Sequence, residues 1–204
     1  AWGPFRRLNF CNKNFEKINK YDNSKAKHDF LAEVCYAAKY EGGSITLYYS
    51  QYQNKYDDFG FSKCTMLARS FGDIGDILRG KNLYFGKKKK KQNGKETERE
   101  KLEDNLRKIF ENIKKENNSK LKSLTDDQIR EYWWTENRET VWKAMTCSED
   151  LKNSSYFHAT CIDGKNQSQA RNQCRCPKTS GNVNIVPTYF DYVPQYLRWF
   201  EEWA

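Results

Sequence analysis

The chain has 204 residues, of which 37% are hydrophobic, 31% charged and 15% aromatic, and its formal net charge is +9. The 6 Trp, 13 Tyr and 12 Phe exclude a disordered chain, because disordered segments lack the aromatic residues that build a core. The positive charge favours acidic partners: nucleic acid, an anionic membrane surface, or a sulfated or sialylated glycan. No apolar run is long enough to cross a bilayer, and no signal peptide opens the sequence.

In the N-terminal part, the segment HDFLAEVCYAAKYEGG predicts a helix, because apolar residues recur in it at helical spacing. These residues are Phe30, Leu31, Val34 and Ala38. We expect Gly42 and Gly43 to end this helix. The Tyr-rich residues 44–63 that follow are predicted to be a loop with at most a short strand.

From Cys64 onward the pattern changes to that of amphipathic helices. Four apolar residues at steps of four, three and four form one stripe, namely Leu67, Phe71, Ile74 and Leu78. Gly80 supplies a stop for this helix. The segment GDILRGK, residues 75–81, fits the G-x-x-x-x-G-K pattern of a phosphate-binding loop, but it lies in the last turns of a helix instead of between a strand and a helix. Asp76 would repel the phosphates, and Asn82 stands where a Ser or Thr should hold magnesium. We therefore do not predict a nucleotide site.

Two capping boxes, Thr97–Glu100 and Thr125–Gln128, predict the starts of two further helices. Their apolar residues are Leu102, Leu106, Ile109, Phe110 and Ile113 in the first and Ile129, Trp133, Val141 and Met145 in the second. A last helix is predicted near Thr188, and Pro194 either kinks it or marks its first turn. Its inward residues are Phe190, Val193, Leu197 and Phe200.

The cysteines are predicted to form a disulfide framework. They are Cys11, Cys35, Cys64, Cys147, Cys161, Cys174 and Cys176. They form no paired C-x-x-C knuckles and the chain has only 2 His, so disulfides in an oxidising compartment are favoured over a metal site. Because 7 is an odd number, one thiol is expected to be free or to pair outside this chain.

These patterns predict a mostly α chain in two units. Residues 1–63 form a loop-rich subdomain, and residues 64–204 form a four-helix bundle whose polar segment 147–187 carries a disulfide-stapled loop. The final residues, YLRWFEEWA, are helix-like and lack a terminating Gly, Asn or Pro. We therefore expect a fragment of a longer extracellular protein.

The order of several long motifs carries a resemblance to a known family. They read PFRRLNFCNKN, KAKHDFLAEVCYAAKYEG, LARSFGDIGDILRGKNLYFG, WWTENRETVWKAMTC, CRC and VPTYFDYVPQYLRWFEEWA. Together they resemble the blocks of Duffy-binding-like alpha domains in the erythrocyte membrane protein 1 adhesins of the falciparum malaria parasite. The REY sequence at Arg130–Tyr132 resembles a motif that sorts these domains into subgroups.

The resemblance implies a fold of three subdomains, of which this chain would hold the first two. It implies an adhesin head on the surface of infected red cells that binds uninfected red cells in rosetting. The implied partners are heparan sulfate or heparin, blood-group sugars, host antibodies and adjacent adhesin domains. Neither nucleic acid nor direct membrane insertion is implied.

The resemblance also implies disulfide pairs. Members often carry a cysteine where this chain has Trp2, and that departure leaves Cys11 to pair with Cys35. Cys64 is expected to bond into the loop at 161–176, and Cys147 is expected to take another cysteine of that loop. Spacing alone does not decide the connectivity.

The candidate glycan-binding residues are all basic: Lys87, Lys88, Lys89, Lys90, Lys91, Lys95, Arg99, Lys101, Arg6 and Arg7. Clustered cations bind repeated anions with strong salt dependence. The alternative for the lysine run is a solvated loop. The alternative for Arg99, Lys101, Arg107 and Lys108 is pairing with acidic residues at helical spacing. Arg6 and Arg7 equally suit a structural ion pair.

Other chemistry finds little support in the sequence. Tryptophans on helical stripes are predicted to be core residues, and Trp134 is the one candidate for stacking on a sugar ring. A thiol nucleophile at Cys35 with His28 as base lacks any sign of a cleft, and His158 lies at no common zinc spacing. We predict no enzyme activity, cofactor or metal. The alternative to an adhesion domain is a spacer that positions a neighbouring receptor-binding domain and presents a variable surface to antibodies.

Overall fold

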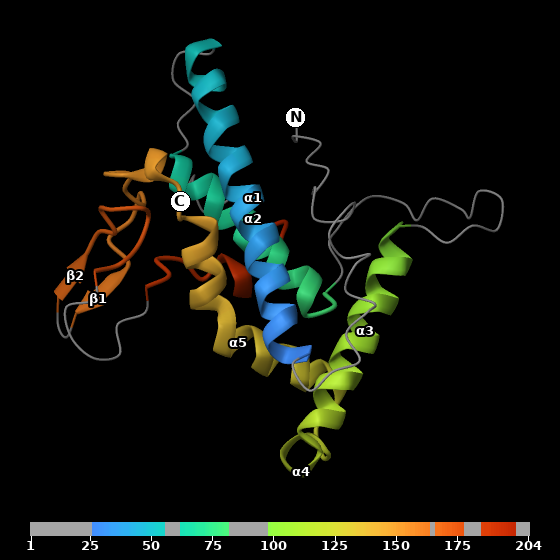
Figure 1. Ribbon diagram of the computed structural model, residues 1–204. Coiled ribbons are helices and arrows are strands. Elements are labelled where there is room, and N and C mark those ends of the chain that lie inside the picture. The colour runs from blue at the N-terminus through green and yellow to red at the C-terminus, as the bar shows by residue number, and fades with distance from the viewer. Residues whose placement is uncertain (1–25, 56–61, 82–97, 164–165, 178–184, 199–204) are drawn as a thin grey trace.

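The computed structural model describes residues 26–55, 62–81, 98–163, 166–177 and 185–198 (Figure 1). Its helices are α1 (Ala26–Lys55), α2 (Lys63–Leu78), α3 (Glu98–Glu116), α4 (Asn118–Leu121) and α5 (Asp126–Met145), with short 3-10 turns at Glu149–Leu151 and Phe190–Tyr192. The strands β1 (Cys161–Asp163) and β2 (Asn166–Ser168) pair antiparallel in one small sheet. The prediction of a mostly α chain is confirmed.

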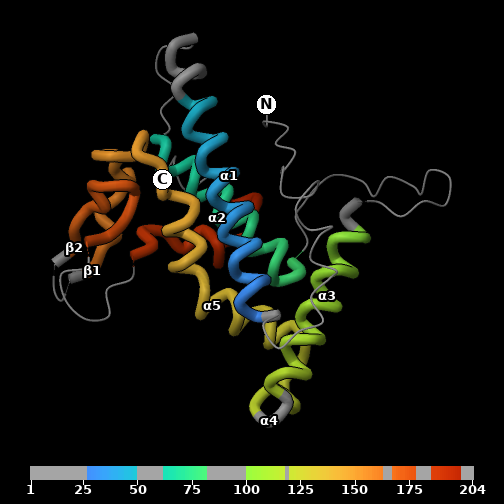
Figure 2. The backbone as a smooth tube through the Cα atoms, viewed as in Figure 1, coloured from blue at the N-terminus to red at the C-terminus, as the bar shows by residue number. Residues whose placement is uncertain are grey.

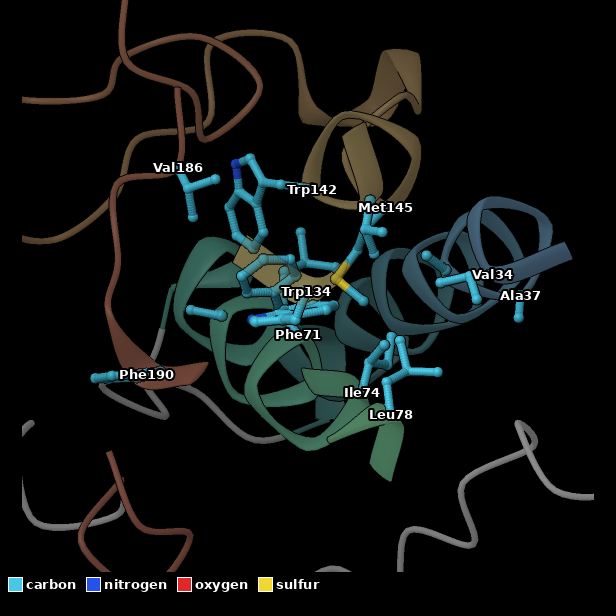
Figure 3. Packing of buried hydrophobic residues seen from close by; sticks show 14 of the residues in the cluster. Val34, Ala37, Phe71, Ile74, Leu78, Trp134, Trp142, Met145, Val186 and Phe190 are labelled. Atoms are coloured by element: carbon cyan, nitrogen blue, oxygen red, sulfur yellow. The ribbon is translucent and has the colours of Figure 1, made fainter. Parts of the chain in front are cut away.

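One apolar core joins α1, α2, α3 and α5. Figure 2 shows the backbone path of these helices. Helices α1 and α5 lie side by side and run in the same direction, since Phe30 contacts Trp133 near their starts and Gly42 meets Met145 near the end of α5. Figure 3 shows Phe71 of α2 among the large side chains of α5. Its ring centroid lies 5.0 Å from that of Trp134 and 5.1 Å from that of Trp142. This packing fixes how the helices are placed against one another.

Helix α1 corrects the prediction that Gly42 and Gly43 end a helix. The helix continues through both glycines to Lys55, across the beginning of the segment predicted to be a loop. A Cβ added at Gly42 would lie 1.9 Å from the carbonyl oxygen of Met145, whereas one added at Gly43 would meet nothing within 4 Å. Gly42 therefore serves the close crossing of two helices, and the prediction missed this because glycine is more common at helix ends.

Helices α2 and α5 follow their predictions closely. The stripe residues of α2 are buried, and Gly80, the residue after the C-cap Arg79, has a φ of +70°, a value that suits glycine. Thr125 caps α5 through a capping box with Gln128, as the sequence predicts. Helix α3 begins at Glu98, and Thr97 of the other predicted capping box lies outside the described residues.

The capping box of α5 gives a first testable prediction. Thr125→Ala removes the side-chain oxygen that accepts a hydrogen bond from the Gln128 backbone N–H at 3.3 Å. We expect the free energy of unfolding to fall by about 1 kcal/mol, measured by urea denaturation followed by circular dichroism. Thr140→Ala, at an exposed position in the middle of the same helix, is the control and should change it by less than about 0.5 kcal/mol. Equal effects of the two substitutions would contradict a capping role.

The cysteine-bearing segment is irregular, as predicted, and holds two disulfides. Cys64 bonds to Cys174, which confirms a link from α2 into the loop, and Cys161 bonds to Cys176. The predicted pairing of Cys147 with a loop cysteine is wrong, because Cys161, Cys174 and Cys176 are all bonded elsewhere. Cys147 is exposed and has no disulfide partner among the described residues.

The pairing of Cys35 with Cys11 stays a prediction. Cys35 is half-buried on α1 and has no disulfide partner among the described residues. Cys11 lies outside the described residues.

The predicted last helix is absent from residues 185–198, a described segment that we call the strap. The strap is irregular, with the 3-10 turn Phe190–Tyr192 and a hydrogen-bonded turn at 195–198. Pro187 and Pro194 flank that turn and disfavour a continuous helix, and the Thr188 hydroxyl accepts a hydrogen bond from the Phe190 N–H at 3.1 Å. Of the residues predicted to face inward, Phe190 is buried, Val193 is half-buried, Leu197 is exposed and Phe200 lies outside the described residues.

The fourth helix of the bundle is therefore α1. It belongs to the segment that the sequence assigned to a separate loop-rich unit, yet it shares the core of the other helices. The division after residue 63 stays a prediction. Among the described helices, none is long and apolar enough to span a membrane.

Candidate functional site

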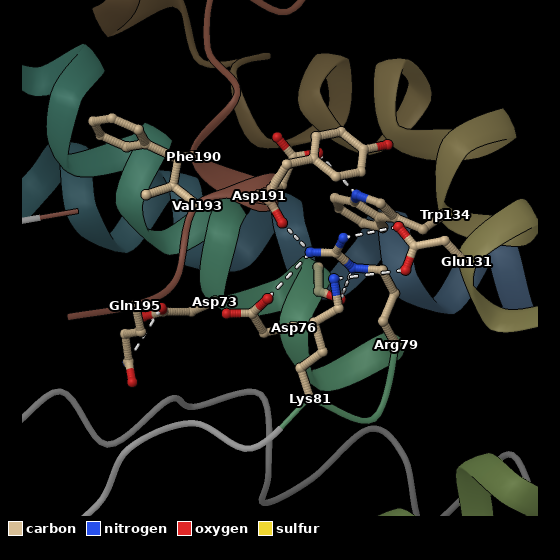
Figure 4. Close-up of polar contacts among 12 residues, drawn as sticks. Asp73, Asp76, Arg79, Lys81, Glu131, Trp134, Phe190, Asp191, Val193 and Gln195 are labelled. Atoms are coloured by element: carbon tan, nitrogen blue, oxygen red, sulfur yellow. Dashed lines mark hydrogen bonds and ion pairs between the residues drawn. The ribbon is translucent and has the colours of Figure 1, made fainter. Parts of the chain in front are cut away.

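A buried network of charges ties the strap to α5 (Figure 4). The carboxylate of Asp191 is fully buried and accepts hydrogen bonds from Arg138 at 2.7 and 2.8 Å and from the indole N–H of Trp134 at 2.8 Å. Arg79 of α2 donates to the backbone carbonyl of Asp191. The turn Phe190–Tyr192 is thereby fixed against both helices.

A second part of the network ties the strap to α2. The side chain of Arg198 is buried and donates to Asp73 at 2.7 Å and to Asp76, which also accepts from Arg79 at 3.1 Å. Burial raises the pKa of Asp76 more than these arginines lower it. Because its donors and acceptors are protein groups that satisfy one another, the network is structural.

One feature of the sequence, a charged residue within an apolar stripe, indicates this network. On α5 the buried stripe passes through Trp134, Arg138, Val141 and Met145, at steps of four, three and four. A charged residue within an apolar stripe must be paired when it is buried. Arg138 therefore predicts a buried carboxylate nearby, but the sequence does not say that the carboxylate is Asp191.

The end of α2 confirms that the G-x-x-x-x-G-K sequence is not a phosphate-binding loop. Gly75 lies inside the helix, where an added Cβ would come within 2.8 Å of the Trp134 ring. Asp76 and Arg79 are used in the buried network. Trp134 itself is fully buried, so the prediction that it could stack on a sugar ring is wrong.

Of the predicted glycan-binding residues, the structure places only those on α3. Lys101 is exposed, and Arg99 lies in the first turn of the helix. Arg107 pairs with Asp104 at 2.8 Å, as the alternative for this helix predicted. Lys87, Lys88, Lys89, Lys90, Lys91, Lys95, Arg6 and Arg7 lie outside the described residues.

The described residues offer no support for a catalytic or metal site. Burial raises the pKa of the Cys35 thiol, which disfavours the thiolate that a nucleophile requires. The ring of His158 packs against that of Phe157, tilted by 38°, at a centroid distance of 4.0 Å. Within the described parts of the chain, no group of three or more potential metal ligands comes together.

Comparison with protein families decides the class of the molecule. Residues 1–198 match the model of the Duffy binding domain. The chain belongs to the Duffy binding domain family. Members of this family are adhesion modules and not enzymes, which agrees with the sequence prediction.

Among solved structures, this Duffy binding domain is similar to two domains of Plasmodium falciparum membrane protein 1. The NTS-DBL1(alpha-1) domain of membrane protein 1 (PfEMP1) from the varO strain is 34% identical, with a TM-score of 0.61, over 97% of this chain and 42% of that chain. The DBLbeta domain of PfEMP1 IT4var13, solved bound to ICAM-1, is 30% identical, with a TM-score of 0.60, over 96% of this chain and 41% of that chain.

A curated relative comes from a second species. The Duffy receptor of Plasmodium vivax (strain Salvador I) is 25% identical over 209 residues, which is 98% of this chain and 15% of the receptor. The chain thus spans less than half the length of each of these relatives. The family predicted from the motifs is confirmed, and the alpha subtype stays a prediction.

Proposed function

We propose that this Duffy binding domain is a host-cell adhesion domain on the infected erythrocyte, where it binds red-cell glycans of the heparan-sulfate or blood-group type in rosetting. Family membership and the similarity to a PfEMP1 domain support adhesion to a host receptor. The net charge of +9 supports an anionic ligand. Host antibodies and adjacent domains of a longer membrane-anchored protein are the further partners.

The observation that carries the glycan part of this proposal is a row of free lysines on α3. Lys101, Lys108 and Lys115 are exposed at intervals of seven residues, so they lie on one face of the helix. Within the described part of the chain, none of them makes an ion pair. Exposed ammonium groups in a row match the repeated sulfates and carboxylates of a heparan chain, and their counterions are released on binding.

Heparin binding across a salt series tests this proposal. We expect heparin binding that weakens steeply as the salt concentration rises. The slope of log affinity against log salt concentration should become shallower by about one for each removed lysine that contacts a sulfate. Two variants divide the surface: one changes Lys87–Lys91 to Ser, and the other changes Lys101, Lys108 and Lys115 to Ser. Weaker heparin binding by one of these variants would assign the glycan contact to the segment that the variant changes.

A matched control removes the same charge from elsewhere. Lys39, Lys143 and Lys152 are exposed on other elements, and changing them to Ser should leave the salt slope within the error of the wild type. An equal loss of heparin affinity in this control would show that binding depends on the net charge of the domain and not on the row of lysines on α3. A folded domain that binds no heparin at low salt would contradict the glycan proposal and favour the spacer role.

A further inference from the structure

The strap and α5 together present exposed tyrosines on one face, which we call the tyrosine face. Tyr132 of α5 is 58% exposed, and Tyr189 and Tyr192 of the strap are 60% and 42% exposed. The hydroxyl of Tyr192 lies 3.3 Å from that of Thr135, one turn after Tyr132 on α5. The guanidinium of Arg138, one turn further, lies 5.7 Å from the Tyr189 ring centroid. The rings therefore follow one side of α5.

The two strap rings, Tyr189 and Tyr192, are held from below. The buried guanidinium of Arg138 lies 5.4 Å from the centroid of the Tyr192 ring, and that of Arg79 lies 5.1 Å from it. Asp191, between the two strap tyrosines, is fixed by the buried network. Preorganised aromatic rings lose little conformational entropy when a partner binds, which is why tyrosine is frequent at binding hot spots.

The charge beside the rings is opposite to that of the whole chain. Glu136 and Glu139 follow Tyr132 on α5 at steps of four and three, so they lie on its side of the helix, and Glu136 is exposed. Glu131 is already paired with Arg79 at 3.0 Å and with Lys81 at 3.6 Å. Lys143, the next exposed cation on α5, lies two turns beyond Glu136. Carboxylates next to exposed aromatic faces attract cations and repel the anionic glycans of the proposed function.

We infer that the tyrosine face is a docking surface for a cationic protein segment, one that carries Arg or Lys side chains. Its guanidinium or ammonium groups would stack on Tyr132 and Tyr189 and pair with Glu136. This surface is separate from the lysines of α3 and serves a partner of opposite charge. The chain would then bind an anionic glycan on one surface and a basic protein segment on another.

A synthetic peptide of alternating Arg and Ser tests the inference by isothermal titration calorimetry. The double variant Tyr132→Ser/Tyr189→Ser leaves all charges in place, and Glu136→Gln removes one carboxylate that makes no described contact. We expect each to weaken binding of the peptide, the double variant by about tenfold. Neither should change heparin binding, so failure here and failure of the glycan proposal are distinguishable.

Matched controls use exposed residues of the other helices. Tyr36→Ser/Tyr40→Ser on α1 removes two tyrosines of similar exposure, and Glu111→Gln on α3 removes one exposed carboxylate. Peptide binding should be unchanged in both. Equal weakening in these controls, or no peptide binding by the folded wild type, would overturn the inference. If the tyrosine face bound the neutral sugar lactose at Tyr189 and did not bind the peptide, the inference would be wrong and the face would be a sugar-binding surface.

Discussion

Asp191→Ala is expected to lower the free energy of unfolding by about 3–5 kcal/mol, because it leaves a buried guanidinium without its partner. Arg138 donates to both carboxylate oxygens of Asp191, and both side chains are almost completely buried. The substitution also removes the acceptor of the Trp134 indole N–H. A loss of this size is a large share of the total stability of a typical domain.

Urea denaturation followed by circular dichroism measures this loss, and a surface ion pair supplies the control. Asp104 pairs with Arg107 on α3, where both side chains are about half exposed, so Asp104→Ala should cost less than about 1 kcal/mol. The double variant Arg138→Met/Asp191→Ala should lose less stability than the two single substitutions added together, since no charge is then left unpaired. A cost for Asp191→Ala as small as for Asp104→Ala would show that the strap is not held by this pair.

The elements that the sequence predicted well are those whose signals are local. In α2 an apolar stripe ends at a glycine with positive φ, and in α5 a capping box fixes the first turn. Both kinds of signal depend on residues within a few positions of one another, so no knowledge of the tertiary contacts is needed. The link from Cys64 into the cysteine loop came from the family resemblance, because spacing leaves many pairings open.

The elements that the sequence missed are set by contacts between distant residues. Phe190, Val193 and Leu197 have helical spacing, but the chain forms an irregular strap instead. Buried hydrogen bonds accepted by Asp191 and donated by Arg198 hold it in that form. Tertiary contacts of this kind override local pattern. The tyrosine face follows from the same cause, because a helix near Thr188 would have placed its tyrosines differently.

Gly42→Ala is expected to destabilise the domain by about 2–3 kcal/mol, because the methyl group would collide with the backbone of α5. The added Cβ would lie 1.9 Å from the carbonyl oxygen and 3.2 Å from the Cα of Met145. A flexible side chain could move aside, but here the nearest atoms are backbone atoms at the end of a helix that is itself fixed by the core. The helices would have to separate, and packing around Met145 and Ile45 would be lost.

The next residue provides an internal control with the opposite sign. Gly43 is exposed within the same helix and has no neighbour within 4 Å of an added Cβ, so Gly43→Ala should stabilise the domain by about 0.5–1 kcal/mol through higher helix propensity. Thermal unfolding of the two variants should shift in opposite directions from the wild type. Parallel shifts would contradict the crossing of α1 and α5 at Gly42.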